Sequence, residues 1–381
     1  MKRKSLMLLV LGACLVVLVC NATPSAADDN RQATAWIISN DPAGNAVLAF
    51  QLANDQLTFV GSVPTGGTGT GGREPDFALG NAHPLQLSED GRLMFVVNPG
   101  SNDISVFSVT NNALTLLNRV SSGGQQPLSV AVHGDLVYVL NGGGNVGGTD
   151  NITGFRAGAD GRLTQISNST QPLSAAATAP AEIGFSPNGK VLVVTEKATN
   201  NLDTYVVGDD GHATGPIVTA SGVITPFGFD VGNRNQLFLA DDFNDAPGLG
   251  AMSTFTIADD GTLHLVSSVV QAHESGACWV SLHKGGRFAL LQDTVSGVIS
   301  VYSVNKEDGS VTFAHSFPSP FASTDLDFSH DGQFLFTVSP DENLQGSPGV
   351  LAWRFNPDDG TVTFLSSVRG LPRTIDGLIA R

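Results

Sequence analysis

The chain has 381 residues, of which 41% are hydrophobic, 7% aromatic and only 14% charged. Its 44 glycines and 19 prolines, together with few helix-forming residues, exclude a coiled coil, a charged helical bundle or a disordered protein and favour β-structure. The 19 basic against 35 acidic residues give a formal charge of -16, which argues against nucleic acid or an anionic membrane as a partner.

The first 27 residues have the pattern of a secretion signal. A basic stretch at residues 2–4 precedes an apolar run from Leu6 to Val19, and the small residues that follow predict cleavage after Ala27. The run is shorter than the roughly 20 apolar residues that span a bilayer as a helix, but an uncleaved anchor or a lipid attached at Cys14 stays open. We therefore expect a signal peptide over 1–27 and one exported domain over 28–381, in the periplasm or outside the cell.

Only Cys278 belongs to the predicted mature chain, because Cys14 and Cys20 lie in the signal. A single cysteine cannot form an internal disulfide, so the domain must be held together by its hydrophobic core. Cys278 opens a predicted strand, and we expect it to be a buried apolar residue rather than a nucleophile.

A four-strand pattern recurs along the chain with a period of roughly 48 residues. One copy has apolar strands over 85–88, 93–98, 103–109 and 114–120, with turns at Asp90-Gly91 and Asn111-Asn112. Asp-Gly and Asn-rich turns between apolar strands favour tight hairpins, because these residues tolerate positive φ. Four antiparallel strands per repeat are typical of a propeller blade.

The two ends of the chain supply the last blade. Six complete copies begin near residues 85, 128, 181, 227, 278 and 325. Residues 34–63 contain three strands and lack a first one, whereas residues 372–380 look like a first strand with nothing after it. We predict an all-β, seven-bladed β-propeller closed by pairing of the C-terminal strand with the N-terminal blade, which removes exposed sheet edges. A pair of β-sandwiches or a β-solenoid is the alternative.

All long insertions fall in connections that the antiparallel order places on one face of the disc. These connections are Pro64–Ala82, Gly142–Asp150, Ser169–Pro180, Asp241–Ala251 and Ser339–Pro348. Insertions confined to one side of a repeat protein favour that side as the binding face, with tolerated drift in loop length as the alternative.

Polar residues beside the inner strands are expected to converge at the mouth of the central channel. Glu196 and Lys197 directly follow an apolar strand, where a carboxylate can act as a general base and a lysine can stabilise negative charge; an exposed loop pair is the alternative. We predict His83 as the proton shuttle. The predicted substrate-binding residues are Glu182, Arg373, Asp293 and Asp325.

No motif calls for a cofactor. The segment 67–72 formally contains GxGxxG, but no helical pattern follows it to hold a phosphate. Asp241, Asp242 and Asp245 offer oxygen ligands of the kind that calcium prefers, although acidic loop residues are usually only solvated. We therefore predict no metal and no cofactor, with calcium at these three residues as the alternative.

A family likeness is carried by residues 179–190, which read Ala-Pro-Ala-Glu-Ile-Gly-Phe-Ser-Pro-Asn-Gly-Lys, and by the following Val194-Thr195-Glu196. With His83-Pro84, Pro226-Phe227-Gly228-Phe229, Ala277-Cys278-Trp279 and Ser329-His330-Asp331-Gly332, these residues resemble the bacterial seven-bladed lactonase propellers. Relatives of that family include 6-phosphogluconolactonase and the fungal carboxymuconate cyclase. The resemblance covers about residues 33–381 and implies a propeller that acts on a small lactone or ester.

The resemblance also implies a site made of an Arg-His pair opening a first strand and a Glu following a second strand. Glu196 matches the Glu, whereas Ala181 and Glu182 stand in place of the pair. An anionic lactone needs a cation for its carboxylate or phosphate, and Glu182 would repel it. Two functions therefore stay open: a lactone or ester hydrolase, or cycloisomerase-like enzyme, on the long-loop face, and a non-catalytic extracytoplasmic module that binds a small ligand or a protein.

Overall fold

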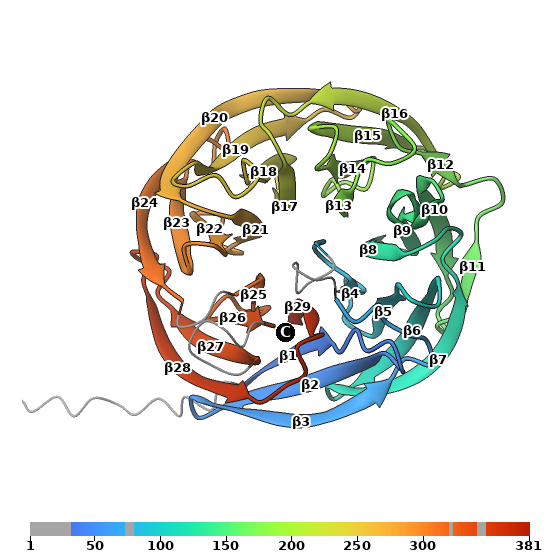
Figure 1. Ribbon diagram of the computed structural model, residues 1–381, viewed down its shortest axis with the longest axis horizontal. Helices are drawn as coiled ribbons and strands as arrows, with labels where there is room; N and C mark the ends of the chain where they lie inside the picture. Colours follow the sequence, from blue (N-terminus) through green and yellow to red (C-terminus); the bar gives the residue numbers. More distant parts are fainter. Residues whose placement is uncertain (1–31, 73–79, 320–322, 341–347) are drawn as a thin grey trace, which may run out of the picture.

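The computed structural model describes residues 32–72, 80–319, 323–340 and 348–381, so the predicted signal peptide lies outside the described residues. Within these ranges 29 strands form seven antiparallel sheets, and one short 3₁₀ helix, η1 (Gly143–Val146), lies in a connection between two strands. The sheets stand around a central opening like the blades of a propeller (Figure 1). The predicted all-β, seven-bladed fold is confirmed. No helix in the described ranges is both long and apolar enough to cross a bilayer.

The blades are numbered here along the chain, each from its inner to its outer strand. Blade 1 has β29 (Asp376–Ala380), β1 (Gln32–Ile38), β2 (Ala46–Ala53) and β3 (Gln56–Pro64). Blade 2 has β4 (Leu85–Leu87), β5 (Leu93–Asn98), β6 (Asp103–Thr110) and β7 (Ala113–Ser121). Blade 3 has β8 (Pro127–His133), β9 (Leu136–Gly142), β10 (Asp150–Ala157), β11 (Leu163–Gln165) and β12 (Gln171–Pro172). Blade 4 has β13 (Pro180–Phe185), β14 (Val191–Glu196), β15 (Asn201–Val207) and β16 (Ala213–Ala220).

The other three blades follow the same order. Blade 5 has β17 (Pro226–Gly232), β18 (Gln236–Asp241), β19 (Gly250–Ile257) and β20 (Leu263–Glu274). Blade 6 has β21 (Ala277–Leu282), β22 (Phe288–Asp293), β23 (Val298–Val304) and β24 (Val311–Pro318). Blade 7 has β25 (Asp325–Phe328), β26 (Phe334–Ser339), β27 (Gly349–Phe355) and β28 (Val362–Arg369).

The ring closes where the sequence predicts. The inner strand of blade 1 is the C-terminal strand β29, which pairs antiparallel with β1 and sets Ala380 opposite Ala35 and Ile379 opposite Trp36. The N–H of Arg381 donates to the carbonyl of Thr34 at 2.7 Å. This pairing gives blade 1 its inner strand and closes the ring of seven blades.

Blade 3 departs from the regular pattern. Its fourth strand is split into the short strands β11 and β12, which pair with different parts of β10. The predicted loop 169–180 thus contributes a strand to the blade instead of being loop throughout. Elsewhere the tight hairpins form as expected: Asn111 and Asn112 both have positive φ, 49° and 63°, which suits the two-residue turn between β6 and β7.

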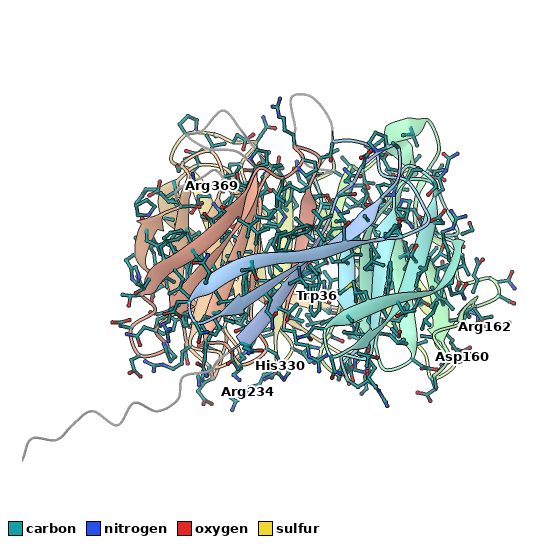
Figure 2. All side chains as sticks on the ribbon, turned by 90° about the horizontal axis from the view of Figure 1, so that it is seen from below. Trp36, Asp160, Arg162, Arg234, His330 and Arg369 are labelled. Atoms are coloured by element: carbon teal, nitrogen blue, oxygen red, sulfur yellow. The ribbon has the colours of Figure 1, made fainter. Side chains whose placement is uncertain are left out.

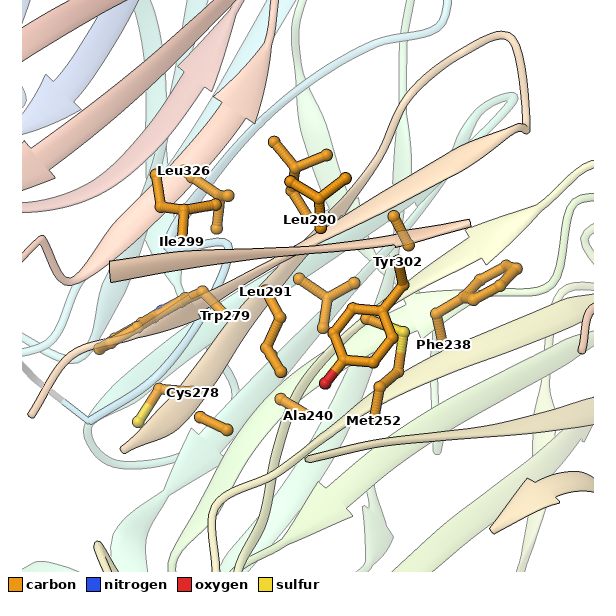
Figure 3. Close-up of a cluster of buried hydrophobic side chains, with 14 of the residues drawn as sticks. Phe238, Ala240, Met252, Cys278, Trp279, Leu290, Leu291, Ile299, Tyr302 and Leu326 are labelled. Atoms are coloured by element: carbon orange, nitrogen blue, oxygen red, sulfur yellow. The ribbon is translucent and has the colours of Figure 1, made fainter. Parts of the chain in front are cut away.

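The hydrophobic core lies between neighbouring blades. Figure 3 shows one such layer, where Leu291 and Tyr302 of blade 6 face Phe238, Ala240 and Met252 of blade 5. All five side chains are almost fully buried. Because each blade packs against the next in this way, the inner strands are held in fixed positions around the central opening.

The disc has two distinct faces. Figure 2 shows Arg369, at the end of β28, on one face and Arg234 and His330 on the other. Arg234 and His330 lie in short turns between the first and second strands of blades 5 and 7. We call this second face the tight-turn face and the opposite one the long-loop face.

The chain enters several inner strands through the same turn. His83, Gln126, Ala179 and Thr225 all have positive φ, between 48° and 57°, and all directly precede the proline at or next to the start of an inner strand. A residue before proline normally avoids helical backbone angles, so the turn is unusual. Because four blades share it, the backbone of His83 belongs to the fold and is not strain peculiar to a site.

Candidate functional site

A short segment crosses the long-loop end of the central channel. Residues 80–83 lead into β4 of blade 2, but they are hydrogen-bonded to the inner strands of three other blades. The N–H of Ala82 donates to the carbonyl of Ala181 in β13 at 3.1 Å, and Nε1 of Trp279 in β21 donates to the carbonyl of Asn81 at 3.0 Å. Because β4 and β21 lie on opposite sides of the opening (Figure 1), this segment spans it and places His83 at the channel.

His83 forms a close pair with Glu182 of β13. Nδ1 of His83 and Oε1 of Glu182 are 2.6 Å apart; the glutamate side chain is 2% exposed and the histidine side chain 26%. Burial lowers the pKa of His83, but the Glu182 carboxylate, with Asp325 and Asp230 farther away, raises it to about 10. His83 is therefore an imidazolium at neutral pH. Its Nδ1 is committed to Glu182, so Nε2 is the nitrogen through which it can exchange a proton with a ligand.

Three channel carboxylates also join neighbouring blades. Glu182 accepts the N–H of Phe229 at 2.7 Å. Asp230 in β17 accepts the N–H of Leu282 at 2.7 Å, and Asp327 in β25 accepts the N–H of Ala380 at 2.8 Å. In each case the donor lies in the inner strand of the next blade. The inner edge of each blade has no further strand to pair with, so its N–H groups need side-chain acceptors.

A glycine makes room for one of these contacts. A Cβ atom at Gly228 would lie 3.3 Å from Oε2 of Glu182 and 2.7 Å from the carbonyl oxygen of Cys278. The second distance is shorter than real contacts allow, so a larger residue would have to displace the strand backbone. Gly228 therefore lets Glu182 reach across to blade 5.

The channel acids have raised pKa values. Burial raises the pKa of Asp230 to about 6, against the opposing effects of the Leu282 N–H and His83. Burial likewise raises the pKa of Asp327 to about 7 and lifts that of Asp325 well above its ordinary value. Two carboxyl groups in the channel therefore titrate near neutral pH, which is the range in which a general base is most effective.

His83, Asp230 and Asp327 line one cavity of about 480 Å³. An adjoining cavity of about 360 Å³ is lined by His83, Glu182 and Asp230. Both extend to the tight-turn face, because turn residues between first and second strands complete their walls; these are Ser88, Glu89, Asp90, Ser186, Pro187, Asn233, Lys284 and His330. The candidate site is thus the channel between the 80–83 segment and the tight-turn face.

Glu196 and Lys197 lie elsewhere. Glu196 ends β14, is fully buried, and accepts hydrogen bonds from the N–H and hydroxyl of Ser174, at 3.0 and 2.5 Å, and from the hydroxyl of Thr199. Lys197 Nζ contacts the carbonyl of Gly80 and lies 4.7 Å from the centre of the Phe227 ring, on the long-loop side of the crossing segment. Neither residue lines the two cavities that contain His83. Their catalytic roles stay predictions.

The last residue of the second strand has the same task in several blades. Asp241 of β18 accepts the hydroxyl of Ser253 at 2.6 Å, and Asp293 of β22 accepts that of Ser300 at 2.6 Å. Burial raises the pKa of Asp241 to about 8 and that of Asp293 to about 7. Each side chain ties the second strand of its blade to the third. We call Asn98, Glu196, Asp241 and Asp293 the second-strand ring.

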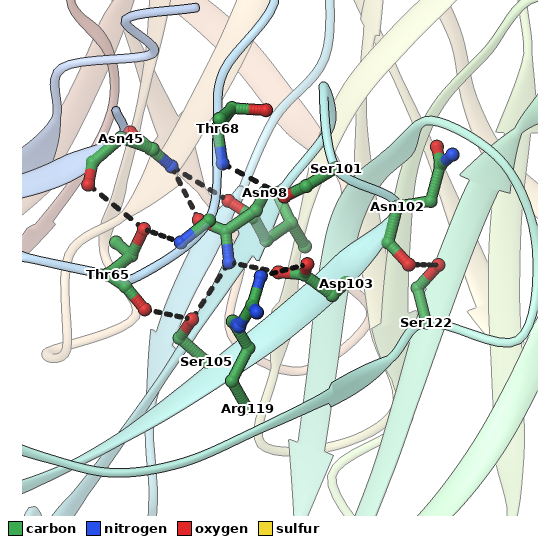
Figure 4. Close-up of polar contacts among 12 residues, drawn as sticks. Asn45, Thr65, Thr68, Asn98, Ser101, Asn102, Asp103, Ser105, Arg119 and Ser122 are labelled. Carbon is green, nitrogen blue, oxygen red and sulfur yellow. Dashed lines mark hydrogen bonds and ion pairs between the residues drawn. The ribbon is translucent and has the colours of Figure 1, made fainter. Parts of the chain in front are cut away.

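Figure 4 shows the neutral member of this ring. Nδ2 of Asn98 in blade 2 donates to Asp103 at 2.7 Å and to Ser105 at 2.8 Å, both on the third strand β6. Its carbonyl oxygen accepts Nδ2 of Asn45 from blade 1 at 2.9 Å. An amide therefore serves at this position as well as a carboxylate does.

The other predicted site residues are dispersed. Asp325 is the buried first residue of β25, two residues before Asp327, and acts electrostatically on His83. Arg373 lies half-buried just before β29 and is outside both cavities that contain His83. The structure thus brings His83, Glu182 and Asp325 together and leaves Arg373 and Asp293 apart. It adds Asp230 and Asp327, whose only sequence signal is a carboxylate within an otherwise largely apolar first strand.

The three acids considered for calcium do not converge. Asp241 turns to Ser253, whereas Asp242 accepts the N–H of Asp245 at 3.3 Å. Among the residues that the structure describes, no three side chains of His, Cys, Asp or Glu are grouped so that they could hold a metal ion.

The structure is a seven-bladed propeller with a charged cavity in its central channel. Known proteins are similar to it in sequence and in fold. The family model described as "Lactonase, 7-bladed beta-propeller" matches residues 73–164. A 6-phosphogluconolactonase of Serratia proteamaculans is 25% identical over 257 residues, covering 65% of this chain and 73% of the relative. That of Photorhabdus laumondii is 22% identical over 261 residues, covering 66% and 75%.

Solved structures show the same architecture. A protein from Lactobacillus plantarum superposes with a TM-score of 0.72 at 16% identity, covering 92% of this chain and 99% of that one. The periplasmic gluconolactonase of Pseudomonas aeruginosa gives 0.69 at 14% identity, with the same coverage of 92% and 99%. At these identities the likeness shows the fold. In sequence, the chain is similar to the lactonase-like seven-bladed propellers.

Proposed function

We propose that the protein hydrolyses a small lactone or ester in the central channel. The observation that carries the proposal is the cavity of about 480 Å³ in which His83, Asp230 and Asp327 meet. A volume in this range fits a small organic ligand, and titratable groups with shifted pKa values in such a cavity are typical of catalytic sites. The relatives named above as lactonases support the same reaction class.

The first step needs a base. The carboxylate of Asp230 or Asp327 takes a proton from a water molecule, and the water oxygen forms a bond to the lactone carbonyl carbon. With pKa values of about 6 and about 7, both groups are ionised just above neutral pH and still basic enough to accept this proton.

The second step needs an acid. The His83 imidazolium stabilises the negative charge on the carbonyl oxygen, and its Nε2 gives a proton to the ring oxygen as the carbon–oxygen bond breaks. Glu182 fixes the ring through the 2.6 Å contact with Nδ1. The product is an open-chain hydroxy acid, and the proton held by the aspartate returns to His83 through water.

A second arrangement would serve the same reaction on the long-loop face. There Glu196 would be the base, His83 the proton shuttle and Lys197 the stabilising cation, with Arg373 and Asp293 binding the substrate. Contact between Lys197 and the 80–83 segment supports it, since that segment ends at His83. Both arrangements include export of the mature domain over 28–381.

A non-catalytic ligand-binding propeller is the second candidate function. The observation that favours it is the use of Glu182, Asp230 and Asp327 as acceptors for backbone N–H groups, which gives each carboxylate a role in blade packing without any reaction.

One experiment separates these possibilities. The purified protein is assayed for hydrolysis of a panel of aldonolactones and simple aryl esters, beside His83→Gln, Glu196→Gln and the control His212→Gln. His212 also pairs with a carboxylate, Asp210, at 3.0 Å, but on an exposed turn outside the channel. We expect turnover that falls by about 100-fold in His83→Gln and is unchanged in His212→Gln. Loss of turnover in Glu196→Gln with an unchanged melting temperature would favour the long-loop arrangement. No turnover by the wild type would favour the binding module.

A further inference from the structure

We infer that the channel selects an uncharged, polyhydroxylated lactone and discriminates against lactones that carry a phosphate or carboxylate group. The inference rests on the proposed function and names its substrate class. It comes from the distribution of charge along the cavity, from the buried end at His83 to the rim on the tight-turn face.

The buried end has more negative than positive groups. The His83 cation is neutralised by Glu182, which touches it at 2.6 Å. Asp230 and Asp327 line the same cavity, and neither has a cation at salt-bridge distance among the described residues. An anionic substrate that brought its carbonyl group to His83 would therefore approach two carboxylates whose charge is not balanced. In a cavity partly shielded from water this repulsion is stronger than in solution.

The same carboxylates suit hydroxyl groups. Each carboxylate oxygen has two acceptor sites, and the backbone N–H bonds described above occupy only one of them on a given oxygen. Gln86 of β4 lines both cavities and offers an amide that can donate and accept. A ligand with several hydroxyl groups can satisfy these acceptors without bringing any charge into the channel.

Two cations at the rim work in the opposite direction. Lys284 and Arg381 line the larger cavity at the tight-turn face, beside Glu89 and Asp90. The Arg381 guanidinium donates to the carbonyl of Gly91 at 2.9 Å, which holds it at the wall. Lys284 is thus the residue through which a phosphorylated lactone could still be bound. Replacing Lys284 shows whether this attraction outweighs the repulsion by the channel carboxylates.

The decisive measurement compares kcat/KM for glucono-1,5-lactone and for its 6-phosphate, which carries about -1.5 to -2 charges at neutral pH. We expect at least a tenfold preference for the uncharged lactone. Equal or better hydrolysis of the phosphate, lost selectively in Lys284→Gln, would overturn the inference and leave the proposed function standing. Hydrolysis of neither lactone, nor of any other in the panel, would overturn both.

A matched pair of rim variants tests the electrostatic cause. Glu89 lines both cavities, whereas Glu307 is an exposed residue paired with Arg234 at 3.1 Å and lines neither. We expect Glu89→Gln to raise the ratio of kcat/KM for the phosphorylated lactone to kcat/KM for the uncharged one about threefold, because one repelling charge is removed. Glu307→Gln should leave this ratio unchanged. An equal effect of both variants, or none of Glu89→Gln, would contradict selection by charge.

Discussion

The channel acids Asp230 and Asp327 and the ring acids Asp241 and Asp293 are two sets of carboxyl groups, on inner strands and on second strands, and they differ in what surrounds them. Asp230 and Asp327 face a cavity, and each binds a backbone N–H of the next blade. Asp241 and Asp293 bind a serine hydroxyl of their own blade and lie outside the cavities that contain His83. The first set can meet a ligand, whereas the second set connects strands.

The pKa values do not separate the two sets. Burial raises the pKa to about 6 and about 7 in the channel and to about 8 and about 7 in the ring. A raised pKa therefore reports that a carboxyl group is buried, and only an adjoining cavity makes it a candidate catalyst. Four predictions test this distinction.

The largest effect is expected from removal of the base. Asp230→Asn or Asp327→Asn, whichever is the base, should lower kcat by about 10²–10⁴-fold, because an amide cannot accept the proton from water. Asp293→Asn is the matched control from the second-strand ring and should keep wild-type turnover. Steady-state kinetics of the three variants checks this. A large loss in Asp293→Asn would contradict the separation of the two sets.

The next effect concerns Glu182 as a positioning residue. Its carboxylate is the main cause of the raised pKa of His83, so Glu182→Gln should lower that pKa from about 10 by at least one unit. The alkaline limit of kcat/KM should move down by the same amount, since the acid form of His83 is lost earlier. Measuring the pH profile distinguishes this from a purely structural role, which would lower activity equally at all pH values.

The wild-type pH profile follows from the same groups. Activity requires an ionised base, so kcat/KM should rise as the pH increases through about 6 to 7, the pKa values of Asp230 and Asp327. It also requires protonated His83, whose neighbours Glu182, Asp230 and Asp325 raise its pKa, so activity should fall near pH 10. A profile governed by one group near pH 4 would exclude both aspartates as the base.

The smallest effect is on stability. The folded pKa values of Asp241 and Asp293, about 8 and about 7, exceed the ordinary value of 3.8, so the folded state binds more protons than the unfolded state between these limits. The free energy of unfolding therefore decreases as the pH rises through this range. Asp241→Asn and Asp293→Asn remove this titrating group. The free energy of unfolding of each variant, taken relative to wild type, should therefore rise by about 1 kcal/mol or more from pH 5 to pH 8.

Urea denaturation at the two pH values measures this difference. Asp308→Asn is the control, because hydrogen bonds from Ser310 lower the pKa of that exposed carboxyl group. A group with a lowered pKa stays ionised in both states above pH 5, so this variant should show no change relative to wild type between pH 5 and pH 8. The same null result for Asp241→Asn would mean that its carboxyl group is not protonated in the folded protein.

The fold was accessible from sequence because its signals are local and repeated. Asp-Gly turns, alternating strands and the complementary ends at 34–63 and 372–380 each follow from short-range rules. The split fourth strand of blade 3 was missed because β11 and β12 are only three and two residues long, too short for a pattern to show.

The candidate site could be predicted from the sequence only in part. His83 and Glu182 stand at the start of inner strands, where a channel position can be expected from the order of strands alone. Asp230 and Asp327 sit within inner strands, and whether such a residue faces the channel depends on bulges and on the next blade. Glu196 shows the converse difficulty: sequence places it at the end of a second strand but cannot show that Ser174 and Thr199 enclose its carboxylate.

The position of the segment 80–83 bears on the face through which a ligand enters and leaves the channel. This segment is hydrogen-bonded to three inner strands at the long-loop end, and the cavities that contain His83 extend to the tight-turn face, so we expect substrate and product to pass through the tight-turn face. Hydrolysis turns a neutral ring into a carboxylate, so the reaction itself creates the repulsion that drives the product out. We therefore expect the acidic channel to bind its neutral substrate better than the acid that it makes, so that the product inhibits the reaction only weakly.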